Sequence, residues 1–121
     1  MAAFSNYTEE ILLDHLLTQG PFYIALYTTS PGDTDTGTEV IAASYARQSI
    51  TFTRLDSDLS NSNSVVFPTA TESWGTITHI GIFDALTAGN LMWHGPLTSS
   101  KLVELGDTIT YPIGASTLNL D

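Results

Sequence analysis

The segment at residues 72–97 constrains the fold of this chain more than any other. Side chains in residues 76–83 repeat with the period of two that is typical of a β-strand, and apolar groups occur on both faces. Residues 91–97 alternate in the same way, and the Gly89-Asn90 pair before them favours the positive φ angles of a tight hairpin turn. The segment therefore predicts an antiparallel hairpin. Its two apolar faces predict that both strands are central in their sheet rather than at an edge.

Residues 6–19 predict the single helix of the chain. Asn6 followed three residues later by Glu9 approximates a capping box, and Gly20-Pro21 ends the helical pattern. This segment has two interpretations: the helix covers an open end or edge of a sheet, or it docks on another subunit. Both rest on a broad apolar stripe along the helix, formed by Ile11, Leu12, Leu13, Leu16 and Leu17.

The rest of the chain is typical of short strands separated by turns. Residues 22–29 are apolar on both faces and predict a central strand, and residues 45–55 alternate between polar and apolar side chains. Between them, residues 30–39 contain only turn formers and polar groups, which predicts a long exposed loop. We expect a polar link at 56–64 and further short strands at 65–67, 98–105, 108–114 and 116–121, with Leu118 and Leu120 facing one way.

These elements predict a mainly β protein. No helical segment separates the strands, which excludes a parallel βαβ architecture. The expected fold is a single antiparallel β-sandwich or jelly-roll-like domain of about seven or eight short strands with one N-terminal α-helix. Within one structural domain, which is what 121 residues allow, residues 1–20 form the N-terminal arm and helix and residues 21–121 the β-sandwich.

Composition excludes several classes of partner. Arg47, Arg54 and Lys101 are the only cations against thirteen carboxylates, so the formal net charge is −10. A surface of that sign repels phosphate, and we therefore expect binding neither to nucleic acid nor to a membrane. No apolar run approaches the roughly 20 residues that span a bilayer, and the first residues lack the pattern of a signal peptide. Cysteine is absent, which excludes disulfides.

Three histidines are the strongest candidates for chemistry. His79 and His94 fall on opposite strands of the predicted hairpin, and together with Asp84 they make a conceivable metal site. Because no HxH or HxxxH spacing is present, we expect structural roles instead, in hydrogen bonds to a neighbouring threonine or carbonyl. Asp33 and Asp35 have only part of the spacing of a calcium-binding loop. With no nucleophile elbow and no phosphate-binding loop, the sequence predicts no enzyme, no cofactor and no metal.

Several motifs occur in order along nearly the whole chain and carry a family resemblance. They are LYTTSPGDTDTGTEV, ASYARQSITF, FPTATESWGTITHIGIFDA, NLMWHGPL and GDTITYPIGASTLNLD. Together they resemble a family of small structural proteins of tailed-bacteriophage virions, which includes capsid decoration (cement) proteins and proteins named phage tail fibre proteins. The resemblance implies a β-rich subunit of a repeated assembly and no catalytic residues.

The resemblance implies a location in the virion, after synthesis in the host bacterial cytoplasm. The leading hypothesis is a capsid decoration protein, a homotrimer that binds the major capsid protein or another virion protein and stabilises the head. A tail-fibre or tail-tip component is the alternative within the structural class. A carbohydrate-binding module is the alternative from another class, with Trp74 and Trp93 as stacking platforms.

Affinity for a virion partner should come from aromatic anchors, because the chain has almost no cations of its own. Phe4 and Tyr7 precede or begin the predicted helix and have no obvious place in a sandwich. The full set of candidate interface residues is Phe4, Tyr7, Tyr45, Arg47, Trp74 and Trp93.

Overall fold

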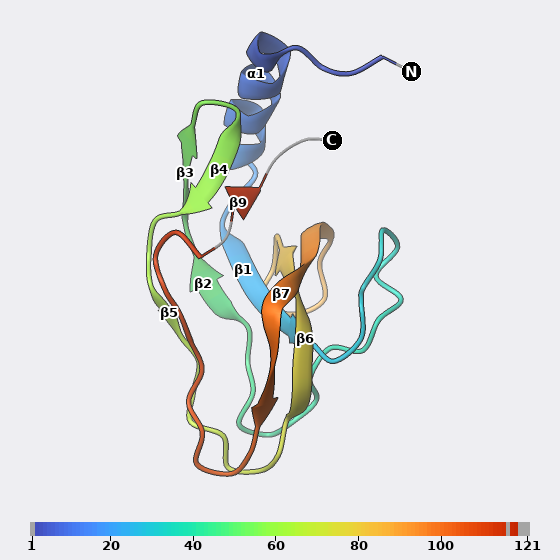
Figure 1. Ribbon diagram of the computed structural model, residues 1–121, viewed down its shortest axis with the longest axis vertical. Coiled ribbons are helices and arrows are strands. Elements are labelled where there is room, and N and C mark those ends of the chain that lie inside the picture. The colour runs from blue at the N-terminus through green and yellow to red at the C-terminus, as the bar shows by residue number, and fades with distance from the viewer. Residues whose placement is uncertain (1, 116, 119–121) are drawn as a thin grey trace.

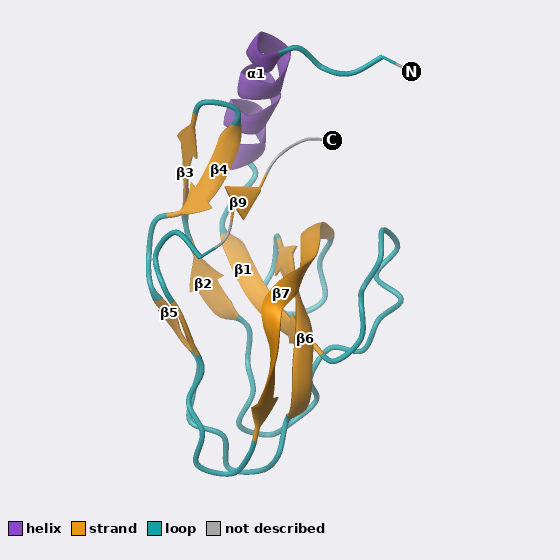
Figure 2. Cartoon of the chain, in the orientation of Figure 1, coloured by secondary structure: helices purple, strands orange, loops and turns teal. Residues whose placement is uncertain are grey.

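The computed structural model describes residues 2–115 and 117–118 (Figure 1). Within these residues the chain has one helix, α1 (Asn6–Leu17), at one end of the molecule, and all strand pairs are antiparallel (Figure 2). The expected mainly β, antiparallel fold with an N-terminal helix is therefore confirmed, and the open sheets fit a sandwich rather than a closed barrel. The described strands are β1 (Phe22–Tyr27), β2 (Gln48–Ile50), β3 (Phe52–Leu55), β4 (Asp58–Asn61), β5 (Val65–Val66), β6 (Gly75–Phe83), β7 (Leu91–Val103), β8 (Thr110–Tyr111) and β9 (Thr117–Leu118).

The largest sheet has the order β2-β1-β6-β7. β6 and β7 form the predicted antiparallel hairpin, and β6 is central as expected. The expectation that both strands are central is wrong for β7, which lies at the edge of this sheet. β7 is also longer than expected, because the segment at 98–103 continues it rather than forming a separate strand. A register shift between Ile77 and His79 lets this long strand bend along β6.

The connection between β6 and β7 spans residues 84–90 and is longer than the tight turn predicted at Gly89-Asn90. The side chain of Asp84 closes it by accepting hydrogen bonds from the backbone N (2.7 Å) and Nδ2 (3.0 Å) of Asn90. Ala88 and Gly89 both have positive φ. A Cβ on Gly89 would lie 2.6 Å from Oδ1 of Asp84, so the closed loop requires glycine there.

β4 lies where a polar link was predicted at 56–64, and that prediction is wrong. Asp56 has φ 55° and turns the chain back on itself, so that β3 and β4 pair as a hairpin. Leu59 and Asn61 of β4 are buried, and Asn61 Nδ2 donates to the carbonyl oxygens of Asn63 (3.1 Å) and Pro112 (2.9 Å). The prediction failed because asparagine is typical of loops in a sequence, whereas this asparagine is buried with its hydrogen bonds satisfied.

The strand expected at 45–55 is divided into β2 and β3 by Thr51. The backbone of Thr51 bonds outside the ladder: its N–H donates to Asn63 Oδ1 (2.9 Å) and its carbonyl accepts from the N–H of Ser62 (2.8 Å). The chain therefore passes from the four-stranded sheet, which contains β2, to the three-stranded sheet β3-β4-β9.

The helix is capped by Ser5 and not by Asn6, the residue expected from the sequence. Ser5 Oγ accepts a hydrogen bond from the N–H of Thr8 at 3.2 Å. Leu13 is the one fully buried residue of α1, which contacts β3 and β4. The helix thus covers the β3–β4 hairpin at the end of the domain, as Figure 1 shows, and this is the first of its two predicted roles.

A continuous core joins the sheets. It includes Ile24 of β1, Ile82 of β6 and Phe67 from the segment after β5, all nearly inaccessible to solvent. Leu118 of β9 is also buried in it, whereas Leu120, expected on the same face, lies outside the described residues.

Candidate functional site

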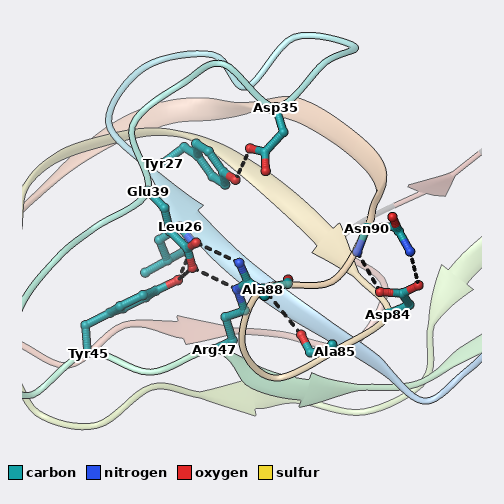
Figure 3. Close-up of polar contacts among 10 residues, drawn as sticks. All are labelled: Leu26, Tyr27, Asp35, Glu39, Tyr45, Arg47, Asp84, Ala85, Ala88 and Asn90. Carbon is teal, nitrogen blue, oxygen red and sulfur yellow. Dashed lines mark hydrogen bonds and ion pairs between the residues drawn. The ribbon is translucent and has the colours of Figure 1, made fainter.

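Arg47, one of the candidate interface residues, is used inside the chain (Figure 3). Its guanidinium forms a two-point ion pair with Glu39, Nε to Oε2 and Nη2 to Oε1, both at 2.9 Å. Nη1 donates to the carbonyl oxygens of Ala85 (3.0 Å) and Ala88 (2.7 Å), and the guanidinium carbon lies 3.7 Å from the centre of the Phe83 ring. Arg47 therefore ties the end of the 30–39 loop to the β6–β7 connection.

Tyr45 shares this cluster. Its hydroxyl donates to Glu39 Oε2 at 2.6 Å and accepts from the backbone N–H of Leu26 at 3.1 Å. Its ring packs against Phe67 and Trp74, with ring centres 6.3 and 5.5 Å apart. Burial, and then the hydrogen bond to the Glu39 carboxylate, raise the pKa of Tyr45 well above its ordinary value.

Tyr27 holds the loop at 30–39 in a similar way. The Tyr27 ring is buried and stacks on Phe83, and its hydroxyl donates to Asp35 Oδ1 at 2.6 Å. Burial, and then this hydrogen bond, raise the pKa of Tyr27 well above its ordinary value. The loop is thus anchored to β1 by a side chain that the sequence pattern assigns only to the core.

We expect the protein to lose stability as the pH rises above about 10, the ordinary pKa of tyrosine. Tyr27 and Tyr45 ionise there in the unfolded chain but stay protonated in the folded chain, because folding raises both pKa values. The free energy of unfolding should therefore fall by up to about 1.4 kcal/mol per pH unit for each of them. Urea unfolding across this pH range measures the slope. Tyr45→Phe should show a shallower slope, and an unchanged slope would contradict the assignment.

Trp74 belongs to the core of the chain. Its side chain is 5% exposed, and its indole Nε1 donates to Ser44 Oγ at 3.0 Å. Ser44 in turn donates from Oγ (2.6 Å) and from its backbone N (3.1 Å) to Glu72 Oε1, and these bonds lower the pKa of Glu72. A partner could contact little of the Trp74 ring in this chain, and its interface role stays a prediction.

Trp93 differs from Trp74 because it is only half-buried. One side of its ring packs against Phe22 and Phe52, with ring centres 6.2 and 6.5 Å away. The residue also lines a surface hollow of about 250 Å³ together with Gly95, Tyr111 and residues of the C-terminal segment. Of the two tryptophans considered as binding platforms, only Trp93 has a surface that a ligand could reach.

Phe4 and Tyr7 are the most accessible of the candidate interface residues. Phe4 is 57% exposed and Tyr7 75% exposed, and Ile11, one helical turn after Tyr7, is 50% exposed. The arm that carries Phe4 extends away from the sheets in Figure 1, and α1 is held from its other side by Leu13. Ile11 was expected in the packed stripe of the helix, but it lies on the solvent side. Phe4 on the arm, with Tyr7 and Ile11 on one side of α1, are the exposed apolar residues that we call the exposed apolar surface of the helix end.

Ion pairs as well as packing hold α1 against the rest of the domain. Arg54 of β3 forms ion pairs with Glu10 and Asp14 of α1. With Arg47 paired to Glu39, both arginines are engaged within the chain, and the charge that remains for a partner is strongly negative.

The structure does not bring His79 and His94 together with Asp84 in one site. In the β6–β7 register His79 lies opposite Pro96, and His94 lies opposite Gly81. His79 Nδ1 hydrogen-bonds Thr78 Oγ1 at 2.8 Å, as expected for a structural histidine, while His94 Nε2 pairs with Asp33 Oδ1 at 2.9 Å. Among the described residues no group of three or more His, Cys, Asp or Glu side chains is placed to hold a metal ion. Nor does any helix in the described ranges have the length and apolarity to cross a membrane.

Two features of the candidate site could not be predicted from the sequence. The pairing of Arg47 with Glu39 has no sequence signal, because Glu39 ends the predicted loop and the two side chains meet only in the folded chain. The hollow beside Trp93 has no sequence signal, because it depends on β8 and β9 approaching the edge strand β7.

Comparison with known proteins gives the family. No curated protein matches the chain. Residues 3–119 match the family described as Podophage GP4 fiber I protein gp80. The match includes the exposed Phe4 and Tyr7, the helix and every strand from β1 to β9. The chain therefore belongs to this phage fibre protein family and is a bacteriophage virion structural protein.

Proposed function

We propose that the protein is a subunit of a phage fibre and that it docks on another virion protein through the exposed apolar surface of its helix end. The observation that carries this proposal is the exposure of Phe4, Tyr7 and Ile11 on the N-terminal arm and the outer side of the helix, at one end of the domain. Aromatic anchors of this kind contribute most of the binding energy in protein interfaces when a pocket on the partner encloses them.

The carboxylates beside this apolar surface indicate what kind of partner surface would be complementary to it. Glu10 and Asp14, three residues after Tyr7 and Ile11, border the apolar surface on α1, and both are already paired with Arg54. A complementary partner presents an apolar pocket with a basic or polar rim. The major capsid protein and other virion proteins remain the proposed partners, and a homotrimer remains the proposed form of the free protein.

The family name favours a fibre component over a capsid decoration protein, which is the second candidate. Both use the same docking surface and differ in the number of copies that a virion holds. A decoration protein covers the head at hundreds of copies, whereas a fibre component is present in far fewer. Quantitative mass spectrometry of purified virions distinguishes the two.

The docking surface is tested by the double substitution Phe4→Ser and Tyr7→Ser in the phage. Both side chains are exposed and the helix cap, Ser5, is retained, so the domain should fold normally. We expect the copy number in purified virions to fall at least about tenfold, because two anchors of an interface are lost. The matched control is Ile113→Ser, which removes a 66% exposed apolar side chain from another part of the surface and should leave the copy number unchanged. A folded double variant at wild-type copy number would refute the docking surface.

A further inference from the structure

The hollow beside Trp93 exists because a side chain is missing from the inner face of β7. Trp93 pairs with Ile82 and Gly95 pairs with Ile80, and both isoleucines belong to the core. Trp93 and Gly95 therefore lie on the core side of the strand, one pleat apart. A Cβ built on Gly95 would have no atom within 4 Å, so the space that a side chain would fill is open.

Two residues of the lining, Trp93 and Thr117, carry polar groups that the described part of the chain does not use. Within the described residues the indole N–H of Trp93 makes no hydrogen bond, and no buried side-chain nitrogen or oxygen there lacks a partner, so this N–H faces solvent. In contrast, the N–H of Trp74 is bonded to Ser44. Thr117, also in the lining, is exposed and its hydroxyl has no partner within the described part of the chain. Trp93 and Thr117 thus bring an aromatic ring, an N–H donor and a hydroxyl to the lining, beside the side chain of Tyr111.

From this geometry we infer that the hollow binds a single neutral pyranose ring. Among the described residues, the lining includes no aspartate, glutamate, lysine or arginine, and its one histidine there, His94, is paired with Asp33. A charged ligand would therefore find no counter-charge, and the net charge of −10 repels anions. A pyranose has an apolar C–H face that can lie on the Trp93 ring and hydroxyls that can bond the indole N–H and Thr117. A hollow of about 250 Å³ limits the site to a small ligand.

The two indole N–H groups allow a direct test by ¹H–¹⁵N NMR of the whole protein. The probes are the methyl glycosides of glucose, galactose, mannose and N-acetylglucosamine, titrated separately. We expect at least one of them to shift the Trp93 indole resonance saturably at millimolar concentration and to leave the Trp74 resonance in place. If no glycoside produces a saturable shift, or if both indoles shift together, the inference is wrong.

Three substitutions test where the glycoside binds. Gly95→Leu places a side chain where a Cβ meets no atom within 4 Å and where φ is not positive, so it should occupy part of the hollow and weaken binding at least about tenfold. Thr98→Leu adds the same side chain at an exposed position of β7 outside the hollow and should bind as the wild type does. Trp93→Phe keeps a ring but removes the N–H and should weaken binding by about two- to tenfold, measured on the glycoside signals. Wild-type affinity in folded Gly95→Leu would overturn the site. Attachment to the virion plays no part in these measurements.

Discussion

Arg47→Ala is expected to lower the free energy of unfolding by about 3–5 kcal/mol, the usual result of removing one partner of a buried ion pair. The Arg47 side chain is 9% exposed, and its loss leaves Glu39 without a counter-charge and the carbonyl oxygens of Ala85 and Ala88 without a donor. Arg47→Lys keeps the charge but not the planar fork that reaches all of these groups at once, so it should recover only part of the loss.

Urea denaturation of the purified variants measures this prediction. The matched control is Arg54→Ala, because Arg54 is also paired with two carboxylates but lies at the surface, where solvent screens the charges. The loss in Arg54→Ala should be much smaller. If the free energy of unfolding falls by a similar amount in both alanine variants, Arg47 does not stabilise the fold as a buried ion pair should.

Trp74→Ala should also cost about 3–5 kcal/mol of unfolding free energy, because it leaves a large cavity in the core. The ring is 5% exposed and packs at an angle of 82° against Tyr45. The substitution also removes the donor to Ser44 Oγ, a group that organises Glu72 and the segment before β6. Thermal and urea unfolding give the change in stability.

Trp93→Ala is the comparison that makes this result specific. Trp93 is half-buried and its N–H has no partner among the described residues, so its removal should cost clearly less than removal of Trp74. The same substitution removes the aromatic surface of the proposed sugar site. Equal losses in the two variants would mean that Trp93 is as much a core residue as Trp74, which is what the sequence pattern alone predicts for a central strand.

Alternation of side chains was enough to predict the strands that contain most of the core. β1 and β6 carry apolar side chains on both faces, and their burial follows from that hydrophobicity. The antiparallel class followed from the absence of helical segments between strands, and the helix from its capping and apolar residues. These signals are local, so each element could be predicted from the residues of its own segment.

Features that depend on contacts distant in sequence were not predictable in this way. β4 is polar, and it becomes a strand because Asn61 finds acceptors at Asn63 and at Pro112, 51 residues away. β7 is an edge strand although its sequence resembles a central one, because strand order is decided by which neighbours pair and not by the strand itself. The same limit applies to the six candidate interface residues, whose exposure ranges from the buried Trp74 to the open Tyr7.

The sequence by itself determined the mainly β class, the N-terminal helix, the β6–β7 hairpin and the acidic, cation-poor composition, because each depends on composition or on the period of nearby side chains. The tertiary structure alone decided that Arg47 and Tyr45 close on Glu39, that Trp74 is buried, and that Trp93 faces a hollow. The physical reason is that burial and hydrogen-bond satisfaction belong to the packed arrangement of several segments, and the chemistry of a residue does not specify which other segments will cover it.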